Sequence, residues 1–332
     1  MSAIDHVVII GAGSWGTALA HVISANTKKV SLIARSKETV EAINTTKKNP
    51  KYLTNLTLAQ NVTANSELSL ASCADLIIIA VPTSGIRNTT QILKELGIKK
   101  TAMLVTVSKG IERGSGLRMS QVIQEILPNN PVGVLSGPNH AEEVSLNLPT
   151  CTVLGFEDLA KATELQPIFC SSNFRTYTSD DLPGIEWGGA IKNTFAIAAG
   201  IARGLSLGDN AVAALVTRGL AEMIRLGMEM GAKQITFSGL SGVGDLMTTC
   251  YSPHSRNHQI GLALAKGNTV AEAEKKLGMV AEGVRNTQSI YEESKKLGVD
   301  TPLIDAVYGI LYKGVSPAEA LTSLFTRELK GE

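Results

Sequence analysis

The chain begins with an apolar run that leads directly into a glycine-rich turn. Residues 7–10 (VVII) are followed by Gly11, Gly13 and Gly16, which form the pattern G-x-G-x-x-G, and then by a stretch typical of an amphipathic helix. This spacing lets the chain turn sharply, approach a pyrophosphate closely and pack the helix on a sheet. The N–H groups and the dipole at the helix N-terminus favour a phosphate oxygen there. Because similar turns also join strands to helices that bind nothing, the meaning of the pattern depends on the sequence that follows.

The rest of the first half repeats the alternation of strands and helices that a dinucleotide-binding fold requires. Further apolar runs lie at residues 30–34, 76–81, 103–107 and 132–135. Helical stretches such as residues 17–24 and 89–96 lie between the runs. Near-continuous β-branched runs are typical of parallel strands that are buried on both faces. We therefore expect an α/β Rossmann-type domain with a parallel sheet over residues 1–190.

The second half changes to helical periodicity from Gly188 onward, and strand-like runs disappear. One long helix is expected to begin at Asp209, which suits an N-cap, and to stop at Gly231. We expect residues 191–332 to form an all-α domain that binds substrate and carries catalysis.

The composition is that of an ordinary globular enzyme and does not favour a protein that binds nucleic acid or an acidic membrane surface. Of 332 residues, 44% are hydrophobic and 18% charged, and the formal net charge is +1. This balance gives no electrostatic reason to expect binding to nucleic acid or to an acidic membrane surface. The four cysteines contain no C-x-x-C pair, so neither a metal site nor a disulfide framework is indicated. We therefore expect reduced thiols, as in a cytosolic protein. The first apolar run is too short to span a membrane and lacks the flanks of a signal peptide, so we interpret it as a strand.

Two charged residues, Arg35 and Lys192, lie at positions where they can act on a cofactor or a substrate. Arg35 occupies the place, about 20 residues after the glycines, where an NAD-specific fold usually has a carboxylate. Because a guanidinium can pair with a 2′-phosphate, Arg35 favours NADPH over NADH, although an exposed arginine at a strand end is the alternative. Lys192 lies among small and apolar residues, where burial lowers the pKa of a lysine and lets it exchange a proton with a substrate oxygen. A solvated lysine on the outer helix face is the other interpretation.

The stretch SGLSGVGDLMTTCYSPHSRNHQIG is rich in turn residues and then opens a helix. Asp245 stands among its glycines, and Ser255, Arg256 and Asn257 lie at the start of the helix. A hydroxyl, a guanidinium and free backbone N–H groups would form a phosphate clamp there. A plain N-cap by Ser255 beside an exposed arginine explains the same residues.

Eight segments carry a resemblance to a known family. They are GAGSWGTALA, VSKGIE, LSGPNHAEEV, GGAIKNTFAIAAGI, LGDNAVAALVTRGLAEM, GLSGVGDLMTTC, SRNHQIG and MVAEGV. In this order, and over nearly the whole chain, they resemble the bacterial NAD(P)-dependent glycerol-3-phosphate dehydrogenases. The resemblance implies reversible hydride transfer between NADPH or NADH and dihydroxyacetone phosphate, which gives sn-glycerol 3-phosphate for glycerophospholipid biosynthesis. It also implies a cytoplasmic homodimer.

The glycine pattern and the resemblance together assign roles to individual residues. The implied cofactor contacts are Gly11, Gly13, Ser14, Trp15, Gly16, Arg35, Lys109, Ala141, Arg256, Val280 and Glu282. The implied substrate contacts are Lys109, Gly137, Asn139, Lys192, Asp245, Ser255, Arg256 and Asn257. Lys192 is the implied catalytic residue, which accepts a proton in oxidation and donates one in reduction. Lys109 and Arg256 would supply positive charge for a dianionic substrate, and Asp245 would orient Lys192.

Some positions depart from the family pattern. Asn139 stands where serine or threonine is frequent, so its contact would be made by an amide. His140 replaces a common phenylalanine, and we interpret it as structural. His254 and His258 flank the expected clamp, and nothing in their spacing assigns them a role.

Two other functions fit parts of the same pattern. A related dehydrogenase acting on a β-hydroxy acid would share the glycines and the lysine but would need a carboxylate-binding site. A regulator that senses NADPH without turnover would bind the cofactor, but it gives no reason for Lys192.

Overall fold

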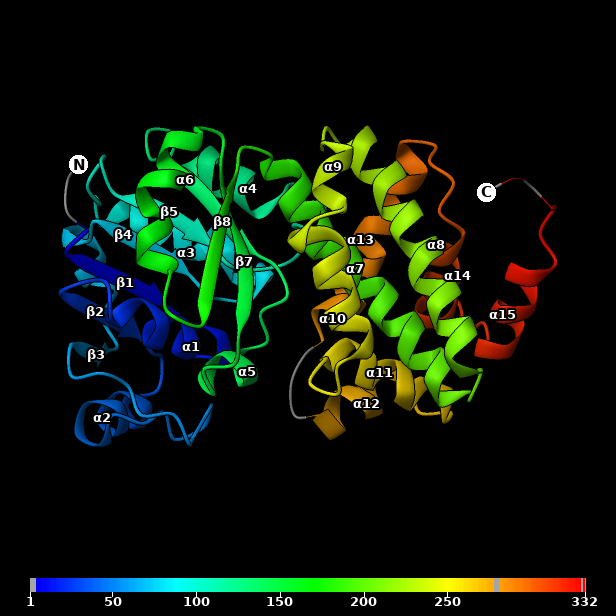
Figure 1. Ribbon diagram of the computed structural model, residues 1–332, viewed down its shortest axis with the longest axis horizontal. Coiled ribbons are helices and arrows are strands. Elements are labelled where there is room, and N and C mark those ends of the chain that lie inside the picture. The colour runs from blue at the N-terminus through cyan, green and yellow to red at the C-terminus, as the bar shows by residue number, and fades with distance from the viewer. Residues whose placement is uncertain (1–3, 278–280, 330, 332) are drawn as a thin grey trace. The chain divides into compact units, whose positions relative to one another are not determined.

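The computed structural model describes residues 4–277, 281–329 and 331, which fold as two compact units (Figure 1). Unit 1 consists of Met1–Lys109 and Leu117–Glu186, and unit 2 of Gly110–Gly116 and Trp187–Glu332. The short segment Gly110–Gly116 therefore belongs to unit 2, although unit 1 surrounds it in sequence. A division of the chain at residue 190 alone does not anticipate this segment.

Unit 1 is built on a sheet of eight strands within the described residues, in the order β3-β2-β1-β4-β5-β6-β7-β8. The strands are β1 (His6–Ile10), β2 (Lys29–Ile33), β3 (Val62–Asn65), β4 (Leu76–Ile79), β5 (Met103–Thr106), β6 (Val132–Ser136), β7 (Thr150–Phe156) and β8 (Phe174–Ser179). The Rossmann-type prediction is confirmed, with one correction. The sheet is not wholly parallel, because β7 returns antiparallel to β6 before β8 continues parallel to β7.

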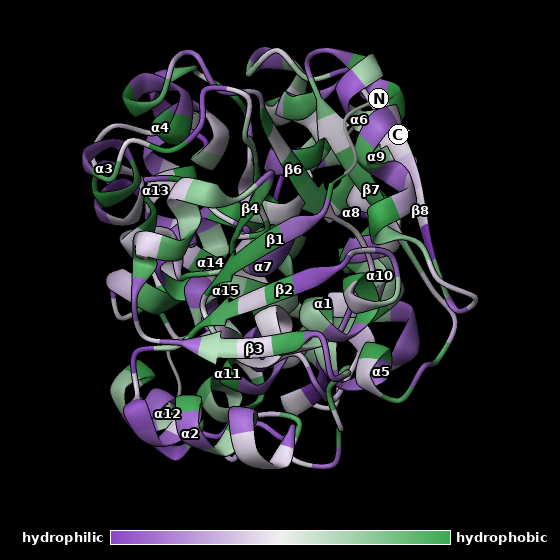
Figure 2. Ribbon diagram, turned by 90° about the vertical axis from the view of Figure 1, so that its left-hand side faces the viewer, coloured by the Kyte–Doolittle hydropathy of each residue, from purple (hydrophilic) through white to green (hydrophobic). Residues whose placement is uncertain are grey.

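The central strands carry apolar side chains on both faces, as the run VVII predicts. Val7 and Ile9 pack with residues of α1 (Ser14–Ser24), whereas Val8 and Ile10 pack with residues of α3 (Ile86–Glu95) and α4 (Met119–Ile126). Figure 2 shows the largely apolar β1 and β4 within this sheet. The remaining helices of unit 1 are α2 (Lys37–Thr46), α5 (Ala141–Ser145) and α6 (Leu159–Leu165). Because β1 has β2 on one side and β4 on the other, its carboxyl end lies where the strand order reverses, the usual ligand position in open α/β sheets.

From Trp187 onward, the regular secondary structure of the described residues of unit 2 is helical, which confirms the predicted all-α part. Its helices are α7 (Leu182–Gly204), which begins in unit 1, α8 (Gly208–Glu229), α9 (Gln234–Phe237), α10 (Asp245–Tyr251), α11 (Arg256–Ala265), α12 (Val270–Leu277), α13 (Glu282–Lys296), α14 (Pro302–Tyr312) and α15 (Pro317–Phe325). Every residue from 184 to 202 is buried, so most of α7 is enclosed on all sides. In the described part of the chain, no helix has the length and apolar character needed to cross a membrane.

The ends of α8 test one local prediction. The helix begins at Gly208, so Asp209 lies inside its first turn and does not form the N-cap that the sequence suggests. Its carboxylate instead pairs with the Arg203 guanidinium, 2.6 Å from Nη1. Gly231, with φ of +85°, follows the end of the helix, where a left-handed residue is favoured.

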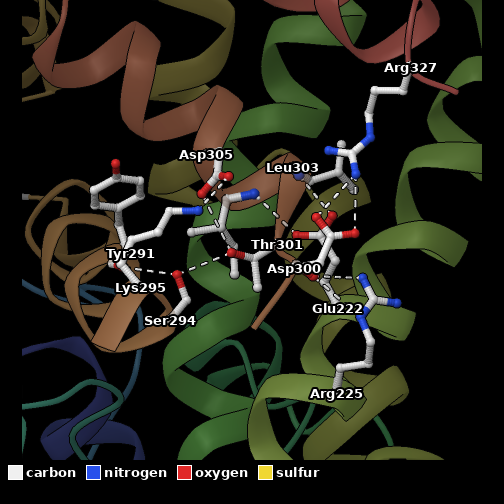
Figure 3. A network of polar contacts seen from close by, with 11 residues as sticks. Glu222, Arg225, Tyr291, Ser294, Lys295, Asp300, Thr301, Leu303, Asp305 and Arg327 are labelled. Carbon is white, nitrogen blue, oxygen red and sulfur yellow. Dashed lines mark hydrogen bonds and ion pairs between the residues drawn. The ribbon is translucent and has the colours of Figure 1, made fainter. Parts of the chain in front are cut away.

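A network of polar contacts ties α8 to the N-terminus of α14 (Figure 3). The buried Glu222 carboxylate of α8 accepts hydrogen bonds from Leu303 N at 2.7 Å and Ile304 N at 3.2 Å. Burial raises the pKa of Glu222 to about 7, although these N–H groups oppose the rise. Beside it, the Asp300 carboxylate pairs with Arg327 and the Asp300 carbonyl accepts from Arg225 (Figure 3).

Candidate functional site

The glycine pattern folds as a tight turn between β1 and α1. Gly11 has φ of +117°, and a Cβ at this position would lie 2.4 Å from the Ala80 carbonyl oxygen. A Cβ on Gly16 would lie 1.9 Å from the Gly11 carbonyl oxygen. The turn therefore requires glycine at both positions. A Cβ on Gly13 would meet no described atom within 4 Å, so this glycine borders open space.

The N-terminus of α1 is arranged to receive an anion. Gly13 is the N-cap, and no side chain of the described residues caps the helix. The N–H groups of the first turn, which begins with Ser14 and Trp15, and the positive end of the helix dipole remain for a ligand. The indole Nε1 of Trp15 is buried and has no hydrogen-bond partner among the described residues. These features fit the pyrophosphate of the dinucleotide that the sequence predicts.

Arg35 lies two residues beyond the end of β2, the strand next to β1. The residue is exposed, and its guanidinium forms no ion pair within the part of the chain that the structure describes. This position suits a 2′-phosphate contact, and it suits an exposed arginine equally well.

Lys109 is held by the turn that follows β6. Its Nζ donates to the Gly137 carbonyl at 2.9 Å and to Asn139 Oδ1 at 3.0 Å, so the structure brings these three predicted residues together. The other end of the Asn139 amide donates to Thr152 Oγ1 at 3.1 Å, and Thr152 donates to the Ser136 carbonyl at 2.8 Å. Asn139 thus uses both ends of an amide to join the lysine to β7. The sequence does not point to Thr152, because it lies on a strand that was not expected.

His140 and Ala141 follow directly after this turn. His140 occupies the N-cap position of α5 without a side-chain cap, and Ala141, the first residue of the helix, is buried. Both therefore lie at the same end of β6 as Asn139.

Lys192 lies in the buried part of α7, with 4% of its surface exposed. Its ammonium forms an ion pair with the Asp245 carboxylate and donates to Thr249 Oγ1 at 2.7 Å. Thr249 Oγ1 in turn donates to the Asp245 backbone carbonyl at 2.6 Å. A lysine on the outer helix face is therefore excluded. A buried ion pair tolerates the loss of water only when further hydrogen bonds complete it, and Thr249 supplies one.

Local backbone geometry places Asp245 beside this lysine. A π-helical turn, Leu240–Gly244, immediately precedes α10, of which Asp245 is the first residue. Such turns are rare and occur often at functional sites. The neighbouring Cys250 is fully buried, and burial raises the pKa of its thiol to about 12, so it stays protonated and is no nucleophile.

The residues of the expected clamp divide between structural and exposed positions. Ser255 Oγ accepts from His258 N at 3.2 Å and forms the N-cap of α11, as the simpler interpretation expects. Arg256, the first residue of that helix, is exposed. The buried Asn257 donates to Asn193 Oδ1 at 2.9 Å and accepts from Gly283 N at 3.0 Å, so it joins α11 to α7 and α13.

The remaining predicted residues have less defined surroundings. Glu282 is the first residue of α13 and is partly buried, whereas Val280 lies outside the described residues. His254 is exposed. His258 is buried, and burial lowers its pKa, which favours the neutral imidazole. The sequence does not point to Asn193 or Thr249. The available signals are that Asn193 directly follows Lys192 and that Thr249 lies one helical turn after Asp245.

Comparison with known proteins decides the family. The sequence model described as "NAD-dependent glycerol-3-phosphate dehydrogenase N-terminus" matches residues 6–162, and the corresponding C-terminus model matches residues 181–322. The chain belongs to this family. The glycerol-3-phosphate dehydrogenase (NAD(P)+) of Clostridium perfringens is 44% identical over 327 residues, which cover 98% of both chains. The crystal structure of the glycerol-3-phosphate dehydrogenase from Coxiella burnetii is 37% identical, with a TM-score of 0.92, over 97% of this chain and 99% of that one.

Membership of the glycerol-3-phosphate dehydrogenase family confirms the resemblance found in the sequence motifs. The chain is an NAD(P)-dependent oxidoreductase with a small-molecule substrate, and the prediction of NADH or NADPH as cofactor is confirmed. A ketopantoate reductase family structure from Ralstonia eutropha, 18% identical with a TM-score of 0.62 over 95% of this chain and 99% of that one, shares the fold alone.

Proposed function

We propose that the protein catalyses the reversible interconversion of dihydroxyacetone phosphate and sn-glycerol 3-phosphate with NADPH or NADH. In the direction of reduction it would supply sn-glycerol 3-phosphate for glycerophospholipid biosynthesis. The observation that carries the proposal is the buried ion pair between Lys192 and Asp245, completed by Thr249, in a chain of this family. An ammonium held in this way is a proton carrier in a site protected from water.

Unit 1 holds the cofactor in this proposal. Gly11, Gly13 and Gly16 let the turn approach the pyrophosphate, and the first N–H groups of α1, at Ser14 and Trp15, bind its oxygens. When bound, the reduced nicotinamide supplies the hydride that reaches the carbonyl carbon of the substrate. Three further cofactor contacts, which rest on the resemblance, are Ala141, Val280 and Glu282.

Lys192 moves the proton. In reduction its Nζ donates a proton to the substrate oxygen as the hydroxyl forms, and solvent then restores the proton to Nζ. In oxidation the neutral amine accepts the hydroxyl proton. Asp245 and Thr249 fix the direction of Nζ, so the amine is oriented before the substrate binds.

In this proposal, two positively charged side chains bind the phosphate of the substrate. Lys109, anchored to Gly137 and Asn139, and the exposed Arg256 each offer a cation to the dianion, and Arg256 also contacts the cofactor in this proposal. Ser255 and Asn257 support Arg256 by fixing the first turn of α11 through the N-cap and the bonds to Asn193 and Gly283. Arg35 makes NADPH the favoured cofactor through its 2′-phosphate.

The test is a turnover assay with the purified full chain. Oxidation of NADPH and of NADH is followed by the absorbance of the reduced nicotinamide, with dihydroxyacetone phosphate as substrate and a keto acid without phosphate as control. We expect turnover with the phosphate ester and little with the acid. Turnover with the acid alone would contradict the proposal and support the β-hydroxy acid alternative. Binding without any turnover would support the nucleotide-sensing regulator.

The resemblance also supports a cytoplasmic location and a homodimer, which we include in the proposal. Light scattering after size-exclusion chromatography measures the mass of the assembly directly. A mass near that of one chain at working concentration would contradict the dimer.

A further inference from the structure

Asn49 is a fully buried polar residue in the loop between α2 and β3, far in sequence from the glycine turn that it contacts. Its Nδ2 donates to the Ala12 carbonyl at 3.0 Å and to Thr17 Oγ1 at 2.9 Å. Its Oδ1 accepts from Lys51 N and Tyr52 N, both at 3.1 Å. An amide offers two donors and two acceptor sites, so all four are used here. The side chain is therefore fixed from both sides, and no freedom remains for it to serve another ligand.

The bond to Ala12 has a consequence for the next residue. The peptide bond is planar and trans, so the carbonyl of Ala12 and the N–H of Gly13 point in opposite directions. Because Asn49 holds the carbonyl toward the interior, the Gly13 N–H is turned the other way. A Cβ on Gly13 would meet no described atom within 4 Å, which shows open space beside this glycine.

The second bond fixes the adjoining helix. Thr17 lies in the first turn of α1, is fully buried, and its N–H donates to the Gly13 carbonyl at 3.0 Å. One side chain thus fixes both the middle of the glycine turn and the start of the helix that follows it. The loop that carries Asn49 is itself closed by a bond from Leu58 N to the Lys47 carbonyl at 2.8 Å.

We propose that Asn49 is the positioning residue of the nucleotide turn: by holding the Ala12 carbonyl it presents the Gly13 N–H to the cofactor pyrophosphate. The inference rests on the proposed binding of NAD(P)H at this turn. Asn49 itself touches neither cofactor nor substrate. Its effect is to orient the donor before the ligand arrives, which removes an ordering cost from binding.

The test compares Asn49→Ala with a matched control, Asn130→Ala. Asn130 is also buried in unit 1 and also donates to two backbone oxygens, Lys99 O and Ala102 O, both at 2.9 Å, but it precedes β6 at the amino end of the strand. Both variants lose an amide with two donated bonds, so both should melt at lower temperature than the wild type. Binding of NADPH is measured by its fluorescence, without substrate. We expect Asn49→Ala to raise the Kd for NADPH about tenfold or more and Asn130→Ala to leave it within about twofold.

A second ligand separates positioning from general damage. The fragment 2′-AMP lacks the pyrophosphate, so its affinity, measured by displacement of NADPH, should be the same in Asn49→Ala and wild type. Equal losses for both ligands, or an unchanged Kd for NADPH, would overturn the inference. Should Asn49→Ala fail to fold, Thr17→Val removes one of the two donated bonds and is measured in the same way, with a smaller loss expected for NADPH alone. A wild type that binds neither NADPH nor NADH would overturn the proposed function together with this inference.

Discussion

Replacing Thr249 by valine tests the role of the proton carrier without removing the carrier. The change keeps the shape of a side chain that is 4% exposed, but it removes the hydroxyl that accepts from Lys192 Nζ at 2.7 Å and donates to the Asp245 carbonyl at 2.6 Å. A hydrogen bond to a charged group is worth about 1.5–3 kcal/mol. Since about 1.4 kcal/mol corresponds to a tenfold change in rate, kcat should fall about ten- to a hundredfold.

The assay is steady-state turnover of dihydroxyacetone phosphate at saturating NADPH, with the Kd for NADPH measured separately. The Thr249 hydroxyl contacts Lys192 and Asp245, and neither residue is a cofactor contact in the proposal, so the Kd for NADPH should stay at the wild-type value. The neighbouring Thr248→Val on the same helix, which changes a partly exposed residue, serves as the control. A Thr249→Val enzyme with kcat within about twofold of the wild type would refute the reasoning that the hydroxyl orients Lys192.

Four further outcomes are expected. Lys192→Ala should lower kcat by far more than it changes the Kd for NADPH, because it removes the proton carrier; near-normal turnover would contradict the assignment. Arg256→Ala should raise the KM for the phosphate substrate sharply, and an unchanged KM would count against the clamp. Arg35→Ala should reduce the ratio of kcat/KM for NADPH to that for NADH, whereas an unchanged ratio would indicate a merely exposed arginine. The pKa of Glu222, raised from 4.5 to about 7, corresponds to about 3 kcal/mol of unfolding free energy that is present below pH 4.5 and lost as the pH rises through 7. The stability of Glu222→Gln, measured by urea unfolding, should therefore depend less on pH over this range, and an undiminished dependence would place the effect on another group.

Local patterns predict the parts of the fold that local physics determines. The strands expected at residues 76–81 and 132–135 are observed as β4 and β6. Continuous apolar runs of this length are typical of strands that are buried on both faces of a sheet. The strand β8 escapes such a prediction. Its sequence FRTYTS is mostly polar and it forms one edge of the sheet, so burial leaves little trace in its composition.

The site is predictable where one segment makes it and unpredictable where distant segments meet. The glycine turn can be predicted because Gly11, Gly13 and Gly16 form one motif within a short segment of sequence. Asn49 and Thr249 contact functional groups across long stretches of chain, and no periodicity in one sequence records such a pairing. The same holds for Asn139, because its amide is held by a hydrogen bond to Thr152 on β7, a strand that the sequence did not predict.

The segment Gly110–Gly116 has a practical consequence for protein engineering. Ile111 is 4% exposed and belongs to the same apolar cluster as Phe195 and Ile290, and a Cβ on Gly116 would lie 2.7 Å from Glu293 Oε1. A truncation that begins at Trp187 would delete this piece of the helical half and leave its apolar neighbours uncovered. Transplanting unit 2 onto another nucleotide-binding scaffold therefore requires that both of its segments, Gly110–Gly116 and Trp187–Glu332, are transferred. A single cut before Trp187 does not suffice.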